Sequence, residues 1–393
     1  MARDPCCTVT AIAASANPMV DLVRNAIESN TPLRIAGRSH WLDAGRPVAA
    51  TRIASLASHT GVVDYVPGDL TITVRAGTTL EDIETITRTE NQWLPLEPHG
   101  SADGTIGATI ATGSFGPLAH GFGRARDLVL GVEFVTGDAR IVRGGGRVVK
   151  NVAGFDLTRL ITGSWGTLGI VTEATLRLYS LPQAFQAVAL SAPSGALPLS
   201  ARLSSILEAP VSALSMELIS AAFAERMGLR RSPAIVMELG GNAASVLAQR
   251  DVLSRLGGMT ELPASPRRLL RMTEHEGLAD DNPIVFRLSS LPARVAEVWG
   301  SAEAAFRDVE DAMIHSTPSL GIVRCVVGRS ALPLVRRIAD SVPSGVTLVY
   351  EKLPVDMWQV LSPTVVSDRL SRGIMQAFDP HRILNPGIMG PVS

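Results

Sequence analysis

One stretch of this chain, GGGRVVKNVAGFDLTRLITGSWGTLGIVTEATLRL at 144–178, constrains the fold more than any other. It crowds glycines between apolar segments, contains no proline and ends in an alternation of apolar and polar residues that is typical of a strand. Glycine permits tight turns, and it also lets the backbone approach a large flat ligand closely. Taken alone, the stretch leaves both interpretations open.

Length, charge and composition exclude several classes of protein. A chain of 393 residues is long enough for two domains with a substantial core. A formal charge of -1 and few aromatic residues argue against a nucleic-acid surface. No apolar run approaches the roughly 20 residues that a membrane helix needs, and the N-terminus lacks the apolar core of a signal peptide. Three cysteines form neither a disulfide framework nor a zinc pattern. We therefore expect a cytoplasmic protein.

The first half of the chain shows a readable order of helices and strands. A capping-box spacing from Thr78 to Glu81 opens the second helix, and Gly137-Asp138 joins two strands of a hairpin. The predicted elements are a helix at 18–29, a strand at 31–37, a strand at 69–77, a helix at 78–91, the hairpin at 128–144 and a strand at 172–182.

From about residue 183 the pattern changes to strands that alternate with helices. The predicted strands are 185–191, 233–241, 282–290, 321–328 and 345–354. The predicted helices are 245–258, 291–306, 332–341 and, near the end, 365–378. This alternation predicts an α/β layer with its helices on one face of the sheet.

Most sequence motifs that carry chemistry are absent. The chain has no P-loop, no G-x-S-x-G elbow, no H-E-x-x-H, no C-x-x-C and no EF-hand loop. The segment 121–126, GFGRAR, stops one glycine short of a Rossmann fingerprint. Three glycine-rich segments remain: RIAGRSH at 34–40, PHGSADGTIGATIATGSFGP at 98–117 and GSWGTLG at 163–169. Their small residues let backbone N–H groups approach phosphate oxygens or a ring edge, although each could also be a tight turn.

These three segments resemble the loops of flavoproteins of the vanillyl-alcohol oxidase type, which carry an FAD domain like that of p-cresol methylhydroxylase. RIAGRS is similar to the loop that binds the FAD pyrophosphate in that family, and GTIGATIATGSFG is similar to the loop that wraps pyrophosphate and flavin. GSWGTLGIVTEATL is similar to the third loop, which supplies strand and backbone contacts. The resemblance implies an FAD cofactor.

A narrower resemblance connects the chain with the FAD-bearing E subunits of bacterial glycolate oxidases. GGRVVKNVAGFDLTRL, Glu97-Pro98-His99 and AFDPHRILNPGIM carry it. It implies an α+β fold with a two-subdomain FAD domain of the p-cresol methylhydroxylase type, an α/β cap domain and a C-terminal segment that returns to the FAD domain. The boundaries that we assign are 1–16 for a flexible tail, 17–182 for the FAD domain, 183–360 for the cap and 361–393 for the C-terminal segment.

The resemblance also implies which residues contact FAD. Arg38 stands where many relatives have glycine, and it can pair with the pyrophosphate. Relatives with covalent flavin have a histidine at that position, so we expect non-covalent FAD. The implied FAD contacts are Arg34, Gly37, Arg38, Ser39, Pro98, His99, Gly104, Thr105, Gly107, Ala108, Thr109, Ala111, Thr112, Gly113, Gly166, Gly169, Ile170, Val171 and Asn385.

Oxidation of a 2-hydroxy acid by such a flavoprotein needs a cation for the substrate carboxylate and a base near its hydroxyl. Arg287, Arg324 and Lys150 are the candidate cations, and His315 is the candidate base. Each also has a structural interpretation: the arginines on the outer face of a strand, Lys150 paired with Asp156, and His315 as an ordinary hydrogen-bonded side chain. We assign His99 to packing against the flavin.

Relatives that oxidise D-2-hydroxy acids carry a paired-histidine metal motif late in the chain, and this sequence has STPSLG in the comparable region. The resemblance therefore implies a complex with a second flavin subunit and an iron–sulfur subunit, through which the chain could also lie peripherally on a membrane. Two functions stay open: an FAD-dependent oxidoreductase subunit acting on glycolate or a related 2-hydroxy acid, or an FAD-binding electron-relay or assembly subunit without its own substrate site. A glycine-rich scaffold without cofactor is a third.

Overall fold

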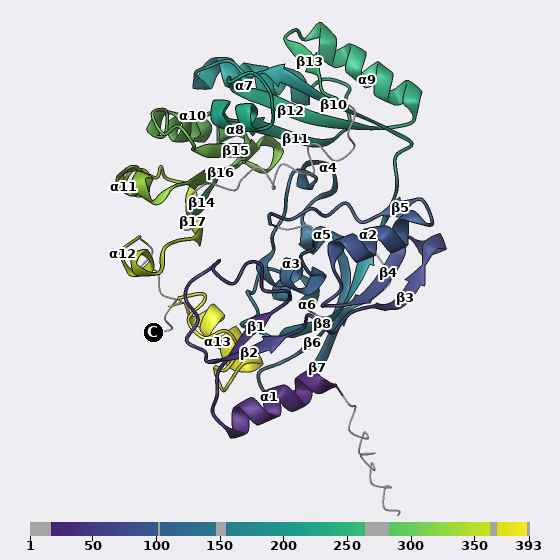
Figure 1. The fold of residues 1–393 in the computed structure, drawn as a ribbon, viewed down its shortest axis with the longest axis vertical. Coiled ribbons are helices and arrows are strands. Elements are labelled where there is room, and N and C mark those ends of the chain that lie inside the picture. The colour runs from purple at the N-terminus through teal and green to yellow at the C-terminus, as the bar shows by residue number, and fades with distance from the viewer. Residues whose placement is uncertain (1–16, 101–102, 147–154, 264–282, 362–367, 391–393) are drawn as a thin grey trace, which may run out of the picture.

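The chain folds into two domains stacked along its long axis, with the N-terminal domain below the cap domain (Figure 1). A computed structural model of the chain describes residues 17–100, 103–146, 155–263, 283–361 and 368–390. The strand β8 (Ile170–Arg177) and the short β9 (Tyr179–Ser180) lead out of the lower domain, and the chain then rises into β10 (Ala184–Ser191) of the cap (Figure 1). The Lys150 prediction and the tail predicted for 1–16 lie outside the described residues.

The N-terminal domain is built on a five-stranded antiparallel sheet with the order β3-β4-β8-β6-β7. Two further strands, β1 and β2, pair in parallel beside it, and β5 pairs with β9. The strands are β1 (Leu33–Ala36), β2 (Arg52–Ser55), β3 (Val62–Val66), β4 (Thr71–Arg75), β5 (Gln92–Trp93), β6 (Val129–Val135), β7 (Ile141–Gly145), β8 (Ile170–Arg177) and β9 (Tyr179–Ser180). The helices are α1 (Pro18–Glu28), α2 (Leu80–Arg88), α3 (Ile106–Thr112), α4 (Ala119–Phe122), α5 (Ala125–Leu128) and α6 (Leu157–Ile161).

Helix α1 shows how the sequence determines this core. Asn17 caps it by accepting a hydrogen bond from the Met19 amide, and Pro18 occupies the first turn, where no amide donor is needed. Its apolar stripe, Val20, Val23 and Ala26, is buried in the cluster that also contains the sheet residues Ile72, Val74, Phe134 and Leu176. Burying an aliphatic side chain of this size contributes roughly 1.5–3 kcal/mol, so the stripe fixes the helix on the sheet.

The local predictions for this domain are largely confirmed, with two exceptions. The single strand predicted at 172–182 is divided into β8 and β9, which belong to different sheets. The predicted helix at 18–29 and the hairpin across Gly137-Asp138 are present as α1 and as β6 paired with β7. The predicted capping box is wrong, because Thr79 rather than Thr78 caps α2 and accepts a hydrogen bond from the Asp82 amide at 3.0 Å. The side chain of Thr78 is instead buried against the Gly61 amide.

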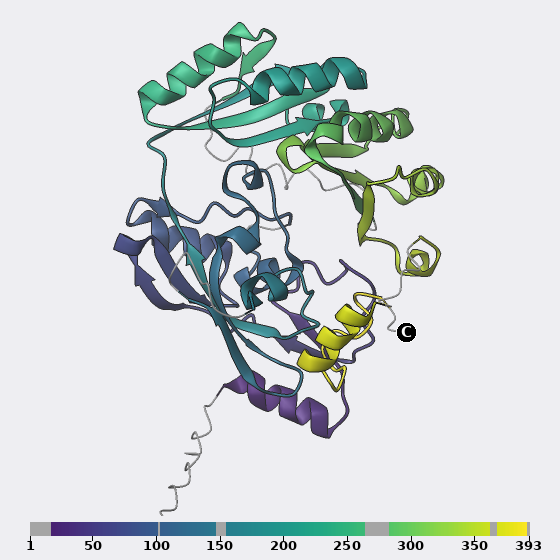
Figure 2. The same ribbon diagram turned by 180° about the vertical axis from the view of Figure 1, so that it is seen from behind.

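The C-terminal segment returns to the N-terminal domain, as the resemblance implied. Helix α13 (Arg369–Phe378) lies beside β1 in both views (Figures 1 and 2). Beyond it, Leu33 donates its amide to the Ile383 carbonyl at 2.7 Å and accepts from the Asn385 amide at 2.9 Å. The end of the chain is therefore hydrogen-bonded to the strand that precedes the first glycine-rich loop.

The cap is built on an eight-stranded antiparallel sheet with the order β13-β10-β12-β11-β15-β16-β14-β17. Its strands are β10 (Ala184–Ser191), β11 (Ala213–Ile219), β12 (Ala234–Gly241), β13 (Met259–Glu261), β14 (Ile284–Ser289), β15 (Met313–Thr317), β16 (Ile322–Val327) and β17 (Thr347–Lys352). Its helices are α7 (Ala196–Leu207), α8 (Ala221–Arg226), α9 (Ala243–Arg255), α10 (Val295–Ala305), α11 (Leu332–Asp340) and α12 (Trp358–Leu361). The sequence patterns did not indicate β11, β15 or α7. The α+β fold class is confirmed.

The two faces of the cap sheet differ in what covers them. The helices α7, α9, α10 and α11 pack on one face in an apolar cluster that includes Met216, Leu218, Met237 and Trp299. Helix α8 packs on the opposite face, against Ile219 and Val236, so the prediction that all helices lie on one face is wrong. The rest of that opposite face carries buried polar side chains, which include Glu217, Glu238, His315 and Arg324.

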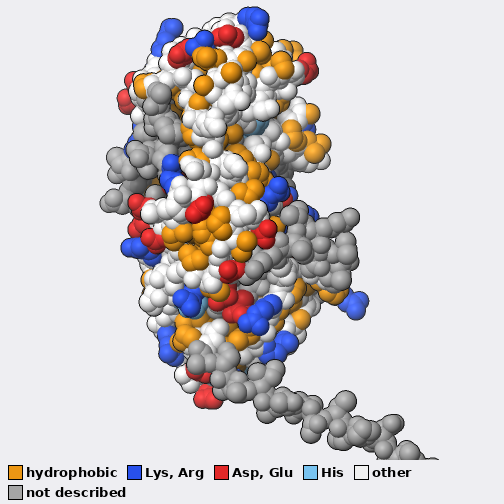
Figure 3. Space-filling model, turned by 90° about the vertical axis from the view of Figure 1, so that its right-hand side faces the viewer, with side chains coloured by type: hydrophobic (Ala, Val, Ile, Leu, Met, Phe, Trp, Pro, Cys, Tyr) orange, Lys and Arg blue, Asp and Glu red, His pale blue; other side chains and the backbone are white. Residues whose placement is uncertain are grey.

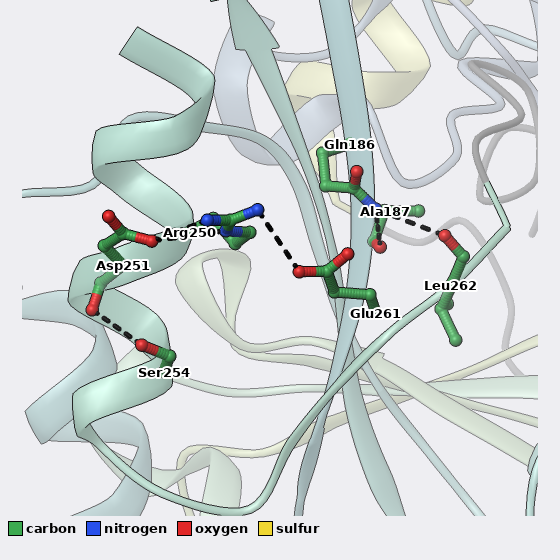
Figure 4. A network of polar contacts seen from close by, with 7 residues as sticks. All are labelled: Gln186, Ala187, Arg250, Asp251, Ser254, Glu261 and Leu262. Atoms are coloured by element: carbon green, nitrogen blue, oxygen red, sulfur yellow. Dashed lines mark hydrogen bonds and ion pairs between the residues drawn. The ribbon is translucent and has the colours of Figure 1, made fainter. Parts of the chain in front are cut away.

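The outer edge of the cap is held by polar contacts at the surface (Figure 4). Arg250 on α9 pairs with Asp251 and lies 3.5 Å from Glu261 of the edge strand β13, and the Gln186 side chain donates to two backbone carbonyls, at Ala187 and Leu262. On the side of the molecule seen in Figure 3, basic and acidic side chains are interspersed with apolar ones. None of the helices in the described ranges has the length and apolar character of a membrane span.

Candidate functional site

A cleft lies where the three glycine-rich segments meet in the N-terminal domain. It contains about 1050 Å³ of empty space, part of it open to solvent. The end of β1, the helix α3 and the start of β8 form its walls, and the C-terminal segment adds Asn385 and Ile388.

The structure brings nearly all of the predicted FAD contacts together in this cleft. Those that line it are Arg34, Gly37, Arg38, Ser39, Pro98, His99, Gly104, Thr105, Gly107, Ala108, Thr109, Ala111, Thr112, Gly166, Gly169, Val171 and Asn385. Gly113 and Ile170 do not. Gly113 ends α3 in the left-handed conformation with φ 65°, and Ile170 is fully buried in β8.

The second glycine-rich segment is a short helix, α3, rather than an open loop. Its first-turn amides already have partners: Ile106 donates to the Thr78 carbonyl at 3.0 Å and Gly107 to the Ala76 carbonyl at 2.8 Å. These two amides are therefore not the phosphate donors that small residues at this position suggested. The glycine at 107 serves close packing, because a Cβ there would lie 2.7 Å from the Ala76 Cβ.

Among the described residues that line the cleft, polar side-chain atoms buried without a hydrogen-bond partner include Arg34 Nη1 and Ser114 Oγ. The other terminal nitrogen of Arg34 donates to the Leu42 carbonyl at 3.0 Å. Burial lowers the pKa of Arg34 from its usual value. A buried cationic donor without a partner costs free energy unless a ligand supplies an acceptor, so this wall fits an anionic, oxygen-rich ligand.

The first loop is charged as well as rich in small residues. Arg38 Nε lies 3.7 Å from Asp103 Oδ2, and His40 Nδ1 lies 3.3 Å from Asp103 Oδ1. Asp103 belongs to the second glycine-rich segment, so these contacts join the first two segments. The cation that we predicted to pair with pyrophosphate has a carboxylate beside it in this structure.

Asn385 and two tryptophans join the third segment to the first. The Asn385 side chain donates to the Trp165 carbonyl at 2.7 Å and accepts from the Ile35 amide at 2.8 Å. The Trp165 ring stacks on Trp41 with 6.4 Å between ring centroids and 13° between planes. Trp165 has a positive φ of 55°, which bulky residues rarely adopt, so the surrounding contacts hold it in a strained conformation.

Comparison with known proteins identifies this domain. Residues 8–145 match the family described as FAD binding domain. The N-terminal domain is an FAD-binding domain. FAD is therefore the cofactor, and the unpartnered Arg34 nitrogen, the Ser114 hydroxyl and the small residues along α3 fit it.

The relatives and the fold agree with this assignment. Over 167 residues, 42% of the chain, the sequence is 41% identical to glycolate oxidase subunit GlcE of Escherichia coli, and the match covers only about half of that protein, 47%. Over 398 aligned positions, 88% of the chain, it is 27% identical to D-2-hydroxyglutarate dehydrogenase of Xanthomonas citri, covering 81% of it. The fold is similar to that of 4-ethylphenol oxidase from Gulosibacter chungangensis, with a TM-score of 0.70, 15% identity and coverage of 95% and 87% of the two chains.

A second cavity, which we call the chamber, adjoins the FAD cleft on the side of the cap. Residues from the FAD-binding domain and from β14, β17 and α12 of the cap line it. The residues that line both the FAD cleft and the chamber are Trp41, His99, Thr112, Ser114, Trp165 and Ile388. The FAD cleft therefore continues into a space that the cap covers.

Charged side chains of the cap meet at the chamber wall. Glu351 accepts from Arg324 Nε at 2.8 Å and from Arg287 Nη1 at 3.2 Å, and Arg324 and Glu351 are both buried. Although burial by itself raises the pKa of Glu351, the charges of Arg324, Arg287 and His99 together hold that pKa below its usual value. The two arginines on the cap sheet thus share one carboxylate, which leaves an excess of positive charge.

The predicted base, His315, lies close to the chamber but does not line it. It is 4% exposed on β15, its Nδ1 lies 3.1 Å from Glu217 Oε2, and Thr317 donates to the other oxygen of Glu217. Its ring packs edge to face on His99, with 5.5 Å between centroids. Of the four predicted catalytic side chains, only Arg287 lines the chamber, Arg324 and His315 lie behind its wall, and Lys150 lies outside the described residues.

Sequence reasoning missed Trp41, Trp165 and Glu351. Trp165 could have been suspected, since it is the one large side chain inside the GSWGTLG segment. Glu351 carries no such signal, because only the pairing of β14 with β16 and β17 brings its carboxylate to both arginines.

Proposed function

We propose that this chain is an FAD-dependent oxidoreductase, or the FAD-bearing subunit of one, that oxidises glycolate or a related 2-hydroxy acid with non-covalent FAD. The observation that carries the proposal is the continuity of the FAD cleft with the chamber, which is lined by Arg287 of the cap and by His99 and Ser114 of the FAD-binding domain. Bound FAD would supply a two-electron acceptor for a hydride.

The charges at the chamber favour a small anionic substrate. Arg46 and Arg287 line it, Arg324 lies behind them, and Glu351 is the acidic residue among the described residues that line it. A substrate carboxylate placed here would meet a net positive charge without displacing Glu351 from its two guanidinium partners. Arg287 is half-buried and keeps one Nη for a ligand once the other is bound to Glu351.

The enclosure supports oxidation by exclusion of water. The stacked pair Trp41 and Trp165 and the indole of Trp358 line the chamber, and Arg46 lies over the Trp358 ring at 5.4 Å. Apolar walls around a few charged groups strengthen the electrostatic interactions inside and orient a small substrate.

A second candidate function has its own support. Glu351 already binds both arginines that we predicted to hold a substrate carboxylate, as expected of a purely structural network. The chain also resembles a protein named as one subunit of glycolate oxidase. In this alternative the chain is an FAD-binding electron-relay or assembly subunit, and in both cases we infer a second flavin subunit and an iron–sulfur subunit as partners.

Anaerobic reduction of the purified FAD protein distinguishes the two. Glycolate, D-lactate and D-2-hydroxyglutarate are added separately, and flavin bleaching is followed by absorbance. Bleaching by one of them supports the oxidoreductase, and no bleaching by any of them, while dithionite bleaches fully, supports the relay. Arg287→Ala should then raise the substrate concentration needed for half-maximal rate at least tenfold, because a charge-assisted contact contributes roughly 1.5–3 kcal/mol.

A matched control uses Arg294, which lies at the surface of the cap and pairs with Glu297. Arg294→Ala removes a guanidinium that is not among the residues lining the chamber and should leave the reduction rate unchanged. Equal effects of the two substitutions would contradict the role of Arg287.

A further inference from the structure

One side chain lies where the FAD cleft meets the chamber and carries a group that can accept a proton. His99 lines both spaces and is half-buried. It follows Pro98 in the segment between β5 and α3, so it belongs to the FAD-binding domain rather than to the cap. From the sequence we expect it to pack against the flavin.

The His99 ring packs against a second ring of the chamber wall and against a histidine of the cap. Its ring lies 6.0 Å from the Phe115 ring and 5.5 Å from the His315 ring, measured between centroids. His315 is oriented by Glu217 at 3.1 Å, and the Phe223 ring packs edge to face with it, with 5.6 Å between centroids. A carboxylate that orients one histidine, which in turn packs against a second, limits the rotation of both rings.

The charges near His99 suit a base that alternates between neutral and protonated forms. The Glu351 carboxylate lies close enough for its charge to interact with that of His99. It would stabilise the imidazolium, whereas Arg287 and Arg324 on the same carboxylate oppose a permanent positive charge. The charged and titratable groups around this site include Glu351, Arg287 and Arg324 from the cap strands and His315 with Glu217 behind it. From the FAD-binding domain they include Arg46 on the chamber wall and Arg124, which lies over the Phe115 ring.

The predicted base, His315, is less suited to contact a substrate directly. It does not line the chamber, and Glu217 and Thr317 hold it within the cap sheet. His99 reaches the chamber from the opposite domain, so a substrate held by Arg287 would lie between the two domains and within reach of the imidazole.

We propose that His99 accepts the hydroxyl proton of the substrate, and that His315 and Glu217 are positioning residues for its ring. This inference rests on the proposed oxidation of a 2-hydroxy acid. In the step the substrate O–H bond breaks and its proton goes to a ring nitrogen of His99. Bound FAD would be the two-electron oxidant that accepts the C–H hydrogen with its electron pair, and the carbinol carbon would become the carbonyl of a 2-oxo acid.

The first test measures proton uptake rather than turnover. Oxalate, a stable anion that mimics the oxyanion of glycolate, is bound to the FAD protein in an isothermal calorimeter at pH 8, in two buffers with different ionisation heats. Wild type should take up about one proton per oxalate bound, because the bound anion favours the imidazolium. His99→Gln should bind oxalate without this uptake. No uptake by wild type, or equal uptake by the variant, overturns the assignment.

The second test uses the anaerobic reduction rate and its pH profile. His99→Gln should slow reduction by about 10²–10⁴-fold, the usual contribution of a general base. Glu217→Gln should shift the midpoint of the pH profile while reduction persists, a change that a purely structural role would not produce. His120 provides the matched control: it lies at the same domain boundary, bonds Ser319 at 2.8 Å and lines neither space, so His120→Gln should behave like wild type.

The outcomes separate this inference from the proposed function. If wild type and His99→Gln are reduced equally fast by a 2-hydroxy acid, the oxidoreductase stands and the role of His99 is wrong. If no 2-hydroxy acid reduces the wild type, but oxalate binding takes up a proton that His99→Gln abolishes, the proton-accepting site stands and the proposed oxidation is wrong.

Discussion

The FAD cleft and the chamber are adjacent, but they are built from different kinds of residues. The cleft is formed by backbone and small side chains, such as Gly37, Gly107 and Gly169, at positions where a Cβ would collide with a neighbour. The chamber wall on the cap side is formed by long charged side chains that reach across strands to a shared carboxylate. The difference implies that the cleft depends on packing at single positions, whereas the chamber depends on a balance of charges.

The largest effect is expected where that charge balance is broken. Glu351→Gln leaves Arg324, which is almost fully buried, without its charged partner, and removal of one member of a buried ion pair costs about 3–5 kcal/mol. Because the folded-state pKa of Glu351 is lowered, its stabilisation is present above the unfolded pKa of about 4.3 and is lost as pH falls through the folded pKa.

Urea unfolding of the FAD-loaded protein at pH 7 and pH 4 measures this effect. The destabilisation should be large at pH 7 and smaller at pH 4. Glu297→Gln, which removes the exposed partner of Arg294, is the control and should change neither value. A loss that is equal at both pH values would show that the carboxylate charge is not what Arg324 requires.

The next largest effect is expected at Gly107, where α3 packs closely against the end of β4. In Gly107→Ala the added Cβ would lie 2.7 Å from the Ala76 Cβ and 2.9 Å from its carbonyl oxygen, so α3 must move away from the end of β4. Overpacking of this kind costs about 1–3 kcal/mol. Because α3 lines the cleft, the flavin absorbance per protein after gel filtration should also fall.

Gly68 supplies the matched control for that substitution, since nothing lies within 4 Å of the position that a Cβ would take there and its φ is not in the left-handed region. Gly68→Ala should retain the full flavin content. Full retention in both variants would contradict the view that the cleft depends on close packing of α3.

The same difference explains what could be predicted from the sequence. Glycine and small residues mark a backbone-lined cleft within short segments, so almost every residue that the resemblance implied lines the cleft, and Gly113 and Ile170, which do not line it, are neighbours of lining residues. The chamber depends on long-range pairing. His315 and Arg324 face each other only because β15 pairs with β16, and β15 was not indicated by its sequence. Register between distant strands is set by tertiary packing, which local patterns do not contain.

A smaller effect is expected at Glu238, a second acid on the polar face of the cap sheet. Its two carboxylate oxygens are buried without a hydrogen-bond partner, and burial raises its pKa to about 8. In the native state the Glu238 carboxyl therefore keeps its proton up to about pH 8, whereas in the unfolded chain it loses that proton above the usual pKa of a glutamate. The free energy of unfolding should fall as pH rises, by roughly 2 kcal/mol between pH 6 and pH 8 from this group alone, and then level off above its folded pKa.

Glu238→Gln removes this pH dependence, because an amide does not titrate. Urea unfolding of the variant and the wild type across pH 6 to pH 9 should therefore give curves that diverge as pH rises, with the variant relatively more stable at the alkaline end. Parallel curves would mean that Glu238 is ionised in the folded protein and has found a partner. Charged partners stabilise the anionic form of Glu351, whereas burial favours the protonated form of Glu238. The stability of Glu351→Gln relative to wild type should therefore fall as pH rises, and that of Glu238→Gln should rise. Opposite trends of this kind would show that paired and unpaired acids on one sheet respond differently to pH.

The smallest effect is expected at the outer edge of the cap, where Arg250 pairs with Asp251 and Glu261 at the surface (Figure 4). Solvent screens such pairs, and holding long side chains in one geometry costs entropy, so Arg250→Ala should leave the melting temperature and the flavin content unchanged within error. Differential scanning fluorimetry at low and at high salt measures this. A clear loss of stability at low salt that disappears at high salt would show that the edge strand β13 depends on these charges. Charge balance would then matter at the outer edge of the cap sheet as well as at the chamber.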